Sequence, residues 1–195
     1  SASFWLVLGL CHPDSEVTVR NVNINPSRAG FLEVIEQMGG SIKITNQAHQ
    51  SGEPIADLTA TSSSLSPVVI EGALIPLLID ELPILALAAC FAKGETLIKD
   101  ASSLRLKETD RIATTTSELR RIGANIEETP DGMIISGVTS LQGGRTSSHG
   151  DHRLAMTLGI AGMLAEGETE IAHPDSTKIS YPGFWDDLEM IAQGA

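Results

Sequence analysis

Residues 105–111, Arg-Leu-Lys-Glu-Thr-Asp-Arg, are the part of the sequence whose side chains are best suited to chemistry. A serine-rich turn precedes them and apolar residues at helical spacing follow, so a loop is predicted to become a helix here. Lys107 and Arg111 are four residues apart and are expected to project from one face of the first turns. A helix start favours an anion through its free N–H groups. With Glu108 between the two cations, the segment suits an anionic substrate that undergoes acid/base chemistry.

The simpler interpretation of this cluster is a solvated helix start whose charges pair with one another. Ion pairs three or four residues apart on an exposed helix contribute only about 0.3–0.5 kcal/mol each. The comparable helix starts elsewhere in the chain carry no such cluster, so stability alone does not require it. Both interpretations remain open at this point.

Asp80 is a second candidate, because it lies between the apolar run 75–79 and the start of a predicted apolar helix. One interpretation is a structural N-cap, with Pro83 in the first helical turn. The alternative is a general base, since a carboxylate at the mouth of an apolar helix can have a raised pKa.

A third candidate is the sequence His-Gly-Asp-His-Arg at residues 149–153, which opens another apolar helix. Two histidines three residues apart suggest a metal, but no cysteine or second carboxylate cluster completes a site, so no metal is predicted. Asp151 is interpreted as an N-cap. Arg153 begins an otherwise apolar helix and is well placed to hold a carboxylate through two parallel hydrogen bonds.

An internal threefold repeat predicts the elements that position these residues. Each copy has an Ala/Gly/Leu-rich helix, a short strand, a loop and a more polar amphipathic helix, and Glu16, Glu95 and Glu168 anchor the three copies. The first helices are apolar nearly all round, which predicts that they are buried. They are expected at 3–11, 83–93 and 153–165.

These patterns predict an α/β (α+β) fold, with one domain over residues 1–195. Three repeated α/β units are expected to pack outward-facing sheets around shared buried helices. Small residues such as Gly159 and Gly162 would let those helices approach closely. Residues 25–28, Asn-Pro-Ser-Arg, are interpreted as a structural cap of the second helix in the first unit.

Composition limits the class of function. The net charge is −12, from 25 acidic and 13 basic residues, which argues against a nucleic-acid surface. No apolar run approaches the ~20 residues needed to span a bilayer, and no signal peptide is predicted. Cys11 and Cys90 lie in apolar runs, as reduced core cysteines do, so a cytoplasmic location is expected.

Taken together, these motifs resemble one family. Residues 105–111, Asp80 followed by Ala-Ala-Cys-Phe-Ala-Lys-Gly-Glu-Thr-Leu-Ile at 88–98, Gly-Asp-His-Arg-Leu-Ala-Met at 150–156 and Ser-Tyr-Pro-Gly-Phe-Trp-Asp-Asp-Leu at 180–188 resemble the C-terminal half of 5-enolpyruvylshikimate-3-phosphate synthases. The likeness runs through essentially the whole chain, and the threefold repeat agrees with that family's domain. The UDP-N-acetylglucosamine enolpyruvyl transferases share the architecture but are less similar at 107–111.

The resemblance implies transfer of the enolpyruvyl group of phosphoenolpyruvate to the 5-hydroxyl of shikimate 3-phosphate, with release of phosphate. Asp80 matches the carboxylate that accepts the hydroxyl proton. Lys107 and Glu108 match residues that assist proton transfer at the phosphoenolpyruvate methylene. Arg111 and Arg153 match arginines that hold phosphoenolpyruvate, and Asp80 and Lys107 are also expected to contact substrate. The resemblance implies no metal and no organic cofactor.

The chain departs from the family pattern in three ways. Family members have two such domains with the site between them, so an N-terminal domain is the expected partner and the chain alone is expected to be inactive. Ser103 stands where some members have an asparagine that contacts shikimate 3-phosphate. Ile179, next to Lys178, stands where some have a lysine, so neither contact is carried over. A non-catalytic module that binds anions through Lys107 and the two arginines remains the alternative from another class.

Overall fold

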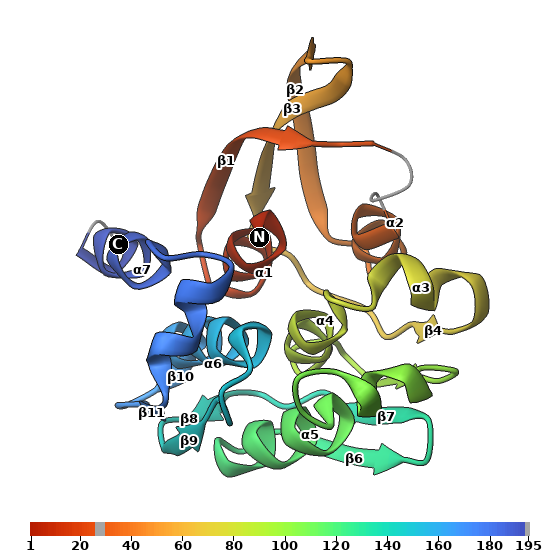
Figure 1. Ribbon diagram of the computed structural model, residues 1–195, viewed down its shortest axis with the longest axis vertical. Coiled ribbons are helices and arrows are strands. Elements are labelled where there is room, and N and C mark those ends of the chain that lie inside the picture. The colour runs from red at the N-terminus through yellow and green to blue at the C-terminus, as the bar shows by residue number, and fades with distance from the viewer. Residues whose placement is uncertain (26–29, 194–195) are drawn as a thin grey trace.

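The computed structural model describes residues 1–25 and 30–193 of the chain (Figure 1). The cap predicted at residues 25–28 therefore lies largely outside the described residues. The first repeat unit contains two helices and three strands. They are α1 (Ala2–Cys11), β1 (Glu16–Asn23), α2 (Gly30–Gln37), β2 (Ser41–Gln50) and β3 (Glu53–Thr61).

The second and third units contain the same succession of helix, strand and helix, and further short elements precede it in both. The second comprises β4 (Val69–Ile70), η2 (Gly72–Leu74), α3 (Ile75–Leu78), α4 (Leu82–Ala89), β5 (Glu95–Ile98), η3 (Ser102–Leu106), α5 (Arg111–Arg121), β6 (Asn125–Thr129) and β7 (Gly132–Ser136). The third comprises β8 (Leu141–Gln142), β9 (Arg145–Ser147), α6 (His152–Leu164), β10 (Ala165–Glu166), β11 (Glu170–Ala172), η4 (Pro174–Ile179) and α7 (Phe184–Gln193).

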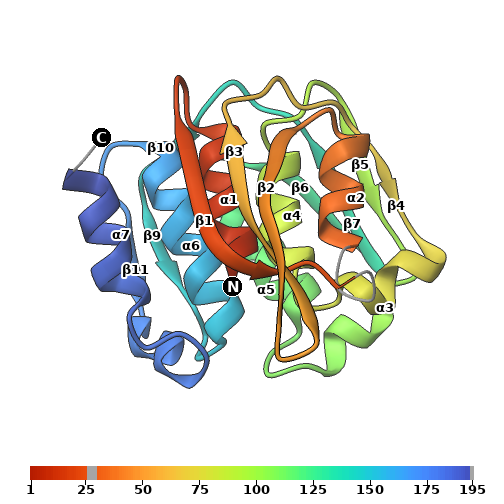
Figure 2. The same ribbon diagram turned by 90° about the horizontal axis from the view of Figure 1, so that it is seen from above.

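The first helices of the units, α1, α4 and α6, pack against one another in the middle of the molecule (Figures 1 and 2). Most of their residues are buried, including every residue of α4. This arrangement follows from helices that are apolar on all faces, because no face is suited to water. α4 ends at Ala89, short of the predicted residue 93, and the chain turns toward β5 at Gly94, whose φ is +144°.

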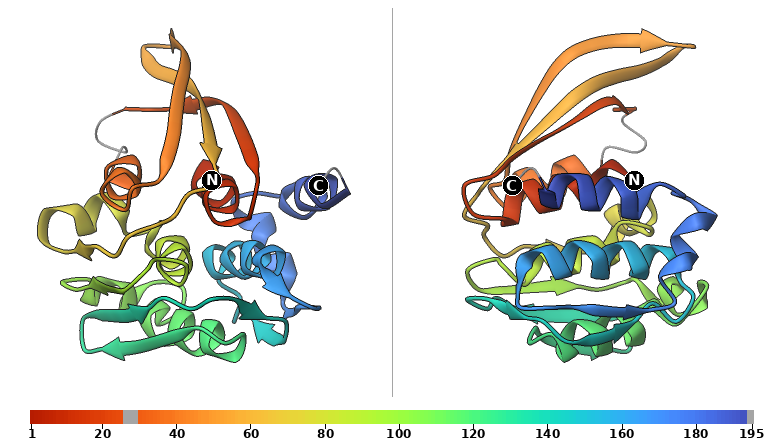
Figure 3. Two further views of the ribbon diagram at one scale, coloured as in Figure 1. Left: turned by 180° about the vertical axis from the view of Figure 1, so that it is seen from behind. Right: turned by 90° about the vertical axis from the view of Figure 1, so that its left-hand side faces the viewer.

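The sheets lie outside this helical layer, as predicted. Strands β1, β3 and β2 form an antiparallel sheet on one side, and β4, β5, β7 and β6 form a mixed sheet on the other (Figures 1 and 3). The third unit has only two parallel pairs, β10 with β8 and β11 with β9. The α/β fold of repeated units is thus confirmed, although over residues 1–25 and 30–193 the third unit has less sheet than the others.

The second helix of each unit is amphipathic and exposes one face to solvent, as the sequence predicts. α7 buries only Phe184, whose ring packs edge-on against Phe4, Tyr181 and Trp185. The close approach of α7 to α6 occurs at Gly159, where a side chain would meet the Phe184 ring.

In the described part of the chain, no helix taken singly has both the length and the apolar character to cross a membrane. Only the helical segments 72–78 and 82–89, taken together, reach that length and composition, and the chain bends by 112° between them.

Candidate active site

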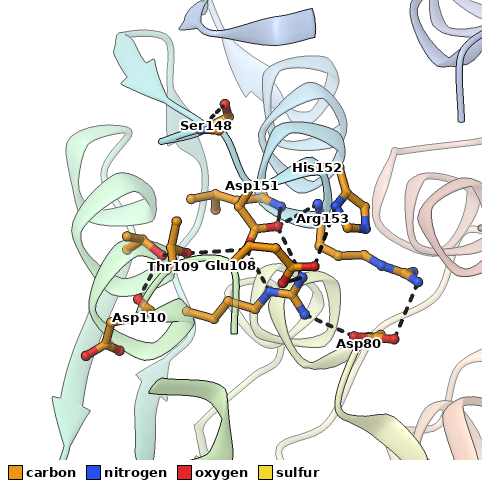
Figure 4. A network of polar contacts seen from close by, with 12 residues as sticks. Asp80, Glu108, Thr109, Asp110, Ser148, Asp151, His152 and Arg153 are labelled. Carbon is orange, nitrogen blue, oxygen red and sulfur yellow. Dashed lines mark hydrogen bonds and ion pairs between the residues drawn. The ribbon is translucent and has the colours of Figure 1, made fainter. Parts of the chain in front are cut away.

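The ends of three helices that carry the predicted site residues meet at one edge of the helical layer (Figure 4). Arg111 is the first residue of α5 and Arg153 is the second residue of α6. Asp80 lies two residues before α4, and Glu108 lies in the segment that leads into α5. The structure therefore brings together Asp80, Glu108, Arg111 and Arg153, which are spread over the second and third units.

Arg111 lies at the centre of this cluster, and its side chain is only 1% exposed. Nε donates to Asp151 Oδ2 at 2.7 Å, and Nη2 reaches Oδ1 of the same carboxylate at 3.3 Å. Nη1 donates to Asp80 at 3.0 Å, and Nη2 also donates to Glu108 at 2.7 Å. Burial alone would lower the pKa of Arg111, but the three carboxylates hold it above its ordinary value. The guanidinium is therefore a fixed cation, and each of its three nitrogens donates to a carboxylate.

Asp151 connects α5 to α6. Its carboxylate is fully buried, accepts from the backbone N–H groups of Arg153 and Leu154, and so caps α6 as predicted. Thr109 Oγ1 lies 3.3 Å from the same carboxylate. Burial disfavours the charged form, yet hydrogen bonds and the charge of Arg111 hold the pKa of Asp151 below its usual range. The bond to Arg111 is a second role that the sequence analysis did not predict.

Asp80 does not cap α4, so the predicted N-cap is wrong. Glu81 occupies that position, without a side-chain cap bond, and Asp80 turns toward Arg111 and Arg153, with Oδ2 3.5 Å from Arg153 Nη2. The alternative of a raised pKa is also contradicted. Burial favours the neutral carboxyl, but the nearby charges of Arg153, Arg111 and Lys107 outweigh it and lower the pKa of Asp80. Asp80 is ionised at neutral pH in this arrangement.

Lys107 and Arg111 do not share a helical face, which corrects the sequence prediction. Asp110 accepts the Ala113 N–H at 3.1 Å and starts α5 at Arg111. Lys107 lies before the helix in extended backbone, where it ends η3. The solvated-pair interpretation also fails for Glu108, because its partner Arg111 is buried. Lys107 is exposed, and among residues 1–25 and 30–193 we find no carboxylate in an ion pair with it.

His152 was considered only as a metal ligand in the sequence analysis, but it borders the cluster. It is 8% exposed, and Nδ1 lies 3.9 Å from Glu108 Oε1. Burial and the charge of Arg153 lower the pKa of His152, which keeps the ring neutral at pH 7. His152 Nδ1 and Arg153 Nε are both buried without a hydrogen-bond partner in the described structure. Buried polar atoms are normally paired, so these two atoms fit a site that receives a polar ligand.

Metal ligation does not explain the cluster. In the described ranges, no three or more His, Cys, Asp or Glu side chains are arranged to hold a metal ion. The carboxylates of Asp80, Glu108 and Asp151 converge on the guanidinium of Arg111 instead.

The remaining residues singled out in the sequence lie on the surface. Ser103 is exposed. Lys178 pairs with Asp175 at 2.6 Å, and both side chains are largely exposed. Ile179 is 71% exposed. Within the residues that the structure describes, none of these side chains forms a hydrogen bond or an ion pair with the cluster.

Comparison with known proteins gives consistent matches. The family model described as EPSP synthase (3-phosphoshikimate 1-carboxyvinyltransferase) matches residues 1–188. The 3-phosphoshikimate 1-carboxyvinyltransferase of Roseiflexus sp. (strain RS-1) is 53% identical over 193 residues, which cover 99% of this chain and 45% of the relative. The protein of the same name from Herpetosiphon aurantiacus is 50% identical over the same shares. The chain spans about half the length of the curated relatives it matches.

Solved structures show the same relationship in three dimensions. EPSP synthase from Acinetobacter baumannii superposes with a TM-score of 0.92 at 35% identity, over 98% of this chain and 44% of that one. The enolpyruvyl transferase NikO from Streptomyces tendae gives a TM-score of 0.72 at 17% identity, over 98% of this chain and 42% of that one. The second likeness shows the fold alone.

Proposed function

Because the chain belongs to the EPSP synthase family, we propose that it is the C-terminal domain of a two-domain enzyme that transfers the enolpyruvyl group of phosphoenolpyruvate to shikimate 3-phosphate. The bond forms at the 5-hydroxyl, and phosphate is released. The observation that carries this proposal is the meeting of Arg111 and Arg153 with the carboxylates of Asp80 and Glu108. Two cations beside two carboxylates suit an anionic substrate that must gain and lose protons.

The contacts of Arg111 suggest how substrate binding would activate the carboxylates. The carboxylate of phosphoenolpyruvate competes for the Nη1 and Nη2 groups that now hold Asp80 and Glu108. The buried Nε bond to Asp151 keeps the guanidinium in place during this exchange. A carboxylate that loses its cationic partner binds protons more tightly. Binding thus converts Asp80 and Glu108 from ion-pair partners into proton acceptors.

The proposed reaction is an addition followed by an elimination. The 5-hydroxyl oxygen adds to C2 of phosphoenolpyruvate while Asp80 accepts its proton, and Lys107 supplies a proton to the methylene carbon. Glu108 then accepts a proton from the resulting methyl group, which expels phosphate and restores the double bond. Arg153 and Arg111 hold the anionic groups throughout, and Arg153 Nε is free to donate. The chemistry needs no metal or organic cofactor.

The proposed partner is the N-terminal domain, which supplies the other wall of the site. We therefore propose that this chain alone does not turn over substrate, because loss of positioning groups can cost many orders of magnitude in rate. We expect the reaction to take place in the cytoplasm, which agrees with the two free cysteines, Cys11 and Cys90.

The specificity for the acceptor substrate is tested in an assembly of this chain with the N-terminal half of its Roseiflexus relative. The assembly is supplied with each of two acceptors in turn. We expect phosphate release from phosphoenolpyruvate with shikimate 3-phosphate and none with UDP-N-acetylglucosamine. Phosphate release only with the nucleotide sugar would favour the UDP-N-acetylglucosamine enolpyruvyl transferases instead.

The site is tested by Asp80→Asn and Glu108→Gln in the same assembly. General acid–base groups contribute about 10²- to 10⁴-fold, so each substitution should lower kcat by at least about 100-fold. Glu127→Gln is a matched control, because Glu127 is an exposed carboxylate on β6. Rates unchanged by both site substitutions would support the non-catalytic anion-binding module.

A further inference from the structure

The turn at residues 147–151 positions Asp151 in the site, and two of its residues have positive φ angles. His149 and Gly150 have φ angles of +52° and +81°, so two consecutive residues adopt the left-handed region. Glycine adopts this region readily, but a residue with a Cβ such as His149 does so at a cost. A turn of this kind persists when surrounding contacts hold it.

Glu118, in the middle of α5, supplies such contacts from a buried position. Its side chain is only 3% exposed. Oε2 accepts from the backbone N–H of Ser147 at 2.9 Å, and Oε1 lies 2.9 Å from Nε2 of His149. Arg121 Nε lies 3.3 Å from Oε1 at the surface. A buried carboxylate is costly unless it is paired. Two partners of Glu118 lie in the turn, and the other two, Arg121 and Ser117, lie on α5 itself, with Ser117 Oγ 3.4 Å from Oε1.

The spacing along α5 relates Glu118 to the site. Glu118 follows Arg111 by seven residues, which is about two helical turns, so both side chains project from the same face. Arg111 binds Asp151 at one end of the turn, and Glu118 binds Ser147 at the other end and His149 at the centre. Two contacts on one helix face therefore fix the turn that presents Asp151 to Arg111.

We propose that Glu118 is a positioning residue that holds the turn at residues 147–151, and through Asp151 sets the guanidinium of Arg111 for the anionic substrate. The expected effect of Glu118 on turnover rests on the proposed function, whereas the expected effect of Glu118 on the position of Arg111 does not. Over the described residues, Glu118 forms no hydrogen bond or ion pair with Arg111, Arg153 or the carboxylates of the cluster, so it acts through the turn.

The turn has a second attachment that preserves the fold when Glu118 is changed. Ser148 Oγ donates to the carbonyl of His173 at 2.8 Å and accepts from the N–H of Gly150 at 3.1 Å. Loss of the Glu118 carboxylate therefore loosens one end of the turn while Ser148 still holds its middle.

The first test measures Arg111 directly in this chain and needs no turnover. Exchange of the Arg111 Nε proton with water is followed by NMR in Glu118→Ala, Glu118→Gln and Arg121→Ala. We expect about tenfold faster exchange in the alanine variant, because the bond to Asp151 opens more often. The glutamine variant keeps a carbonyl for Ser147 and should retain most protection. Arg121→Ala removes an exposed partner that lies outside the turn and should leave the exchange unchanged.

The second test measures kinetics in the assembly with the N-terminal half. Glu118→Ala should raise the KM for phosphoenolpyruvate and lower kcat, each by about tenfold, while the KM for shikimate 3-phosphate stays within twofold. A misplaced binding group has this selective effect, whereas general destabilisation affects both substrates alike. Glu118→Gln should restore most of the activity.

Unchanged exchange of the Arg111 proton in Glu118→Ala would overturn the positioning role whatever the enzyme does. An equal loss for both substrates, or a glutamine variant as impaired as the alanine variant, would also contradict it. An unmodified assembly that releases no phosphate would instead contradict the proposed function, and the exchange measurement would still decide the role of Glu118.

Discussion

Arg111 shares its guanidinium among three carboxylates, of which only Asp151 is as buried as the arginine itself. Replacing Asp151 with asparagine keeps an oxygen to cap α6 but leaves the buried cation without the counter-charge that is buried with it. Breaking a buried pair on one side costs about 3–5 kcal/mol, and a loss of that size is expected for Asp151→Asn. Urea unfolding of the chain measures it.

Asp175→Asn is the matched control, because the pair between Asp175 and Lys178 is largely exposed and its removal should change stability little. A loss below about 1 kcal/mol for Asp151→Asn would show that the carboxylate contributes mainly as a cap.

Local signals account for which residues of the cluster the sequence analysis singled out. Glu108 and Arg111 lie in one conspicuous charged segment, and Arg153 stands out against an apolar helix. Their convergence with Asp80 is present in the structure. The bond between Arg111 and Asp151 was not predicted, because it joins residues that are 40 positions apart and the capping pattern already explained Asp151. His152 was missed because its burial and its position beside Glu108 come from contacts between distant parts of the chain.

His152 predicts a pH dependence of stability. Its pKa in the folded chain lies below the ordinary value of about 6.5, so the unfolded chain takes up a proton at a higher pH than the folded one. The contribution of the neutral ring to the free energy of unfolding is complete above pH 6.5. This contribution is lost as the pH falls from 6.5 toward the pKa of the folded chain. The free energy of unfolding should fall there by at most about 1.4 kcal/mol per pH unit from this group.

This contribution is isolated by comparing the chain with His152→Gln in urea unfolding at pH 7.5, 6.5 and 5.5. The variant should show a shallower decline toward pH 5.5. Equal declines in both proteins would mean that burial does not disfavour the charged ring.

At the scale of elements, α7 depends on a close approach to α6 at Gly159. A Cβ at Gly159 would lie 2.8 Å from Phe184 Cε1 and 3.0 Å from Trp185 Cζ3. Alanine improves helix propensity by about 1 kcal/mol, but overpacking of a core contact costs about 1–3 kcal/mol. We expect Gly159→Ala to lower the unfolding midpoint in urea and to change the near-ultraviolet circular dichroism of the aromatic cluster.

Gly183→Ala serves as the control for this substitution, because no atom lies within 4 Å of a Cβ built there. An increase in stability for Gly159→Ala, with an unchanged near-ultraviolet circular dichroism spectrum, would show that α7 can shift without loss of stability.

The periodicity of the sequence predicts the elements well where burial is uniform. Apolar helices such as α1 and α6 were expected within one residue of their observed bounds, because every face is buried. The start of α5 was placed too early, because the charges around Lys107 resemble a first helical turn while Asp110 supplies the actual cap. Sheet pairing in the third unit was not predictable, since β8 and β10 are two residues long and carry little pattern.

At the scale of the whole molecule, the chain combines a continuous core with a site that is open on one side. The three central helices and the sheets around them bury a single apolar cluster. The site residues instead lie at one edge, where Asp80 and Glu108 remain 43% and 46% exposed. A chain of this kind is expected to fold by itself, and we propose that its site residues need a second wall to exclude water and fix the substrates.

The central claim is tested most directly by phosphate release from phosphoenolpyruvate and shikimate 3-phosphate, measured with the chain alone and with a separately made N-terminal half. We predict release only in the mixture, at a rate that saturates as the N-terminal half is added. Turnover by the chain alone at a rate near that of the mixture would contradict the account, as would no release from two folded halves shown to bind each other.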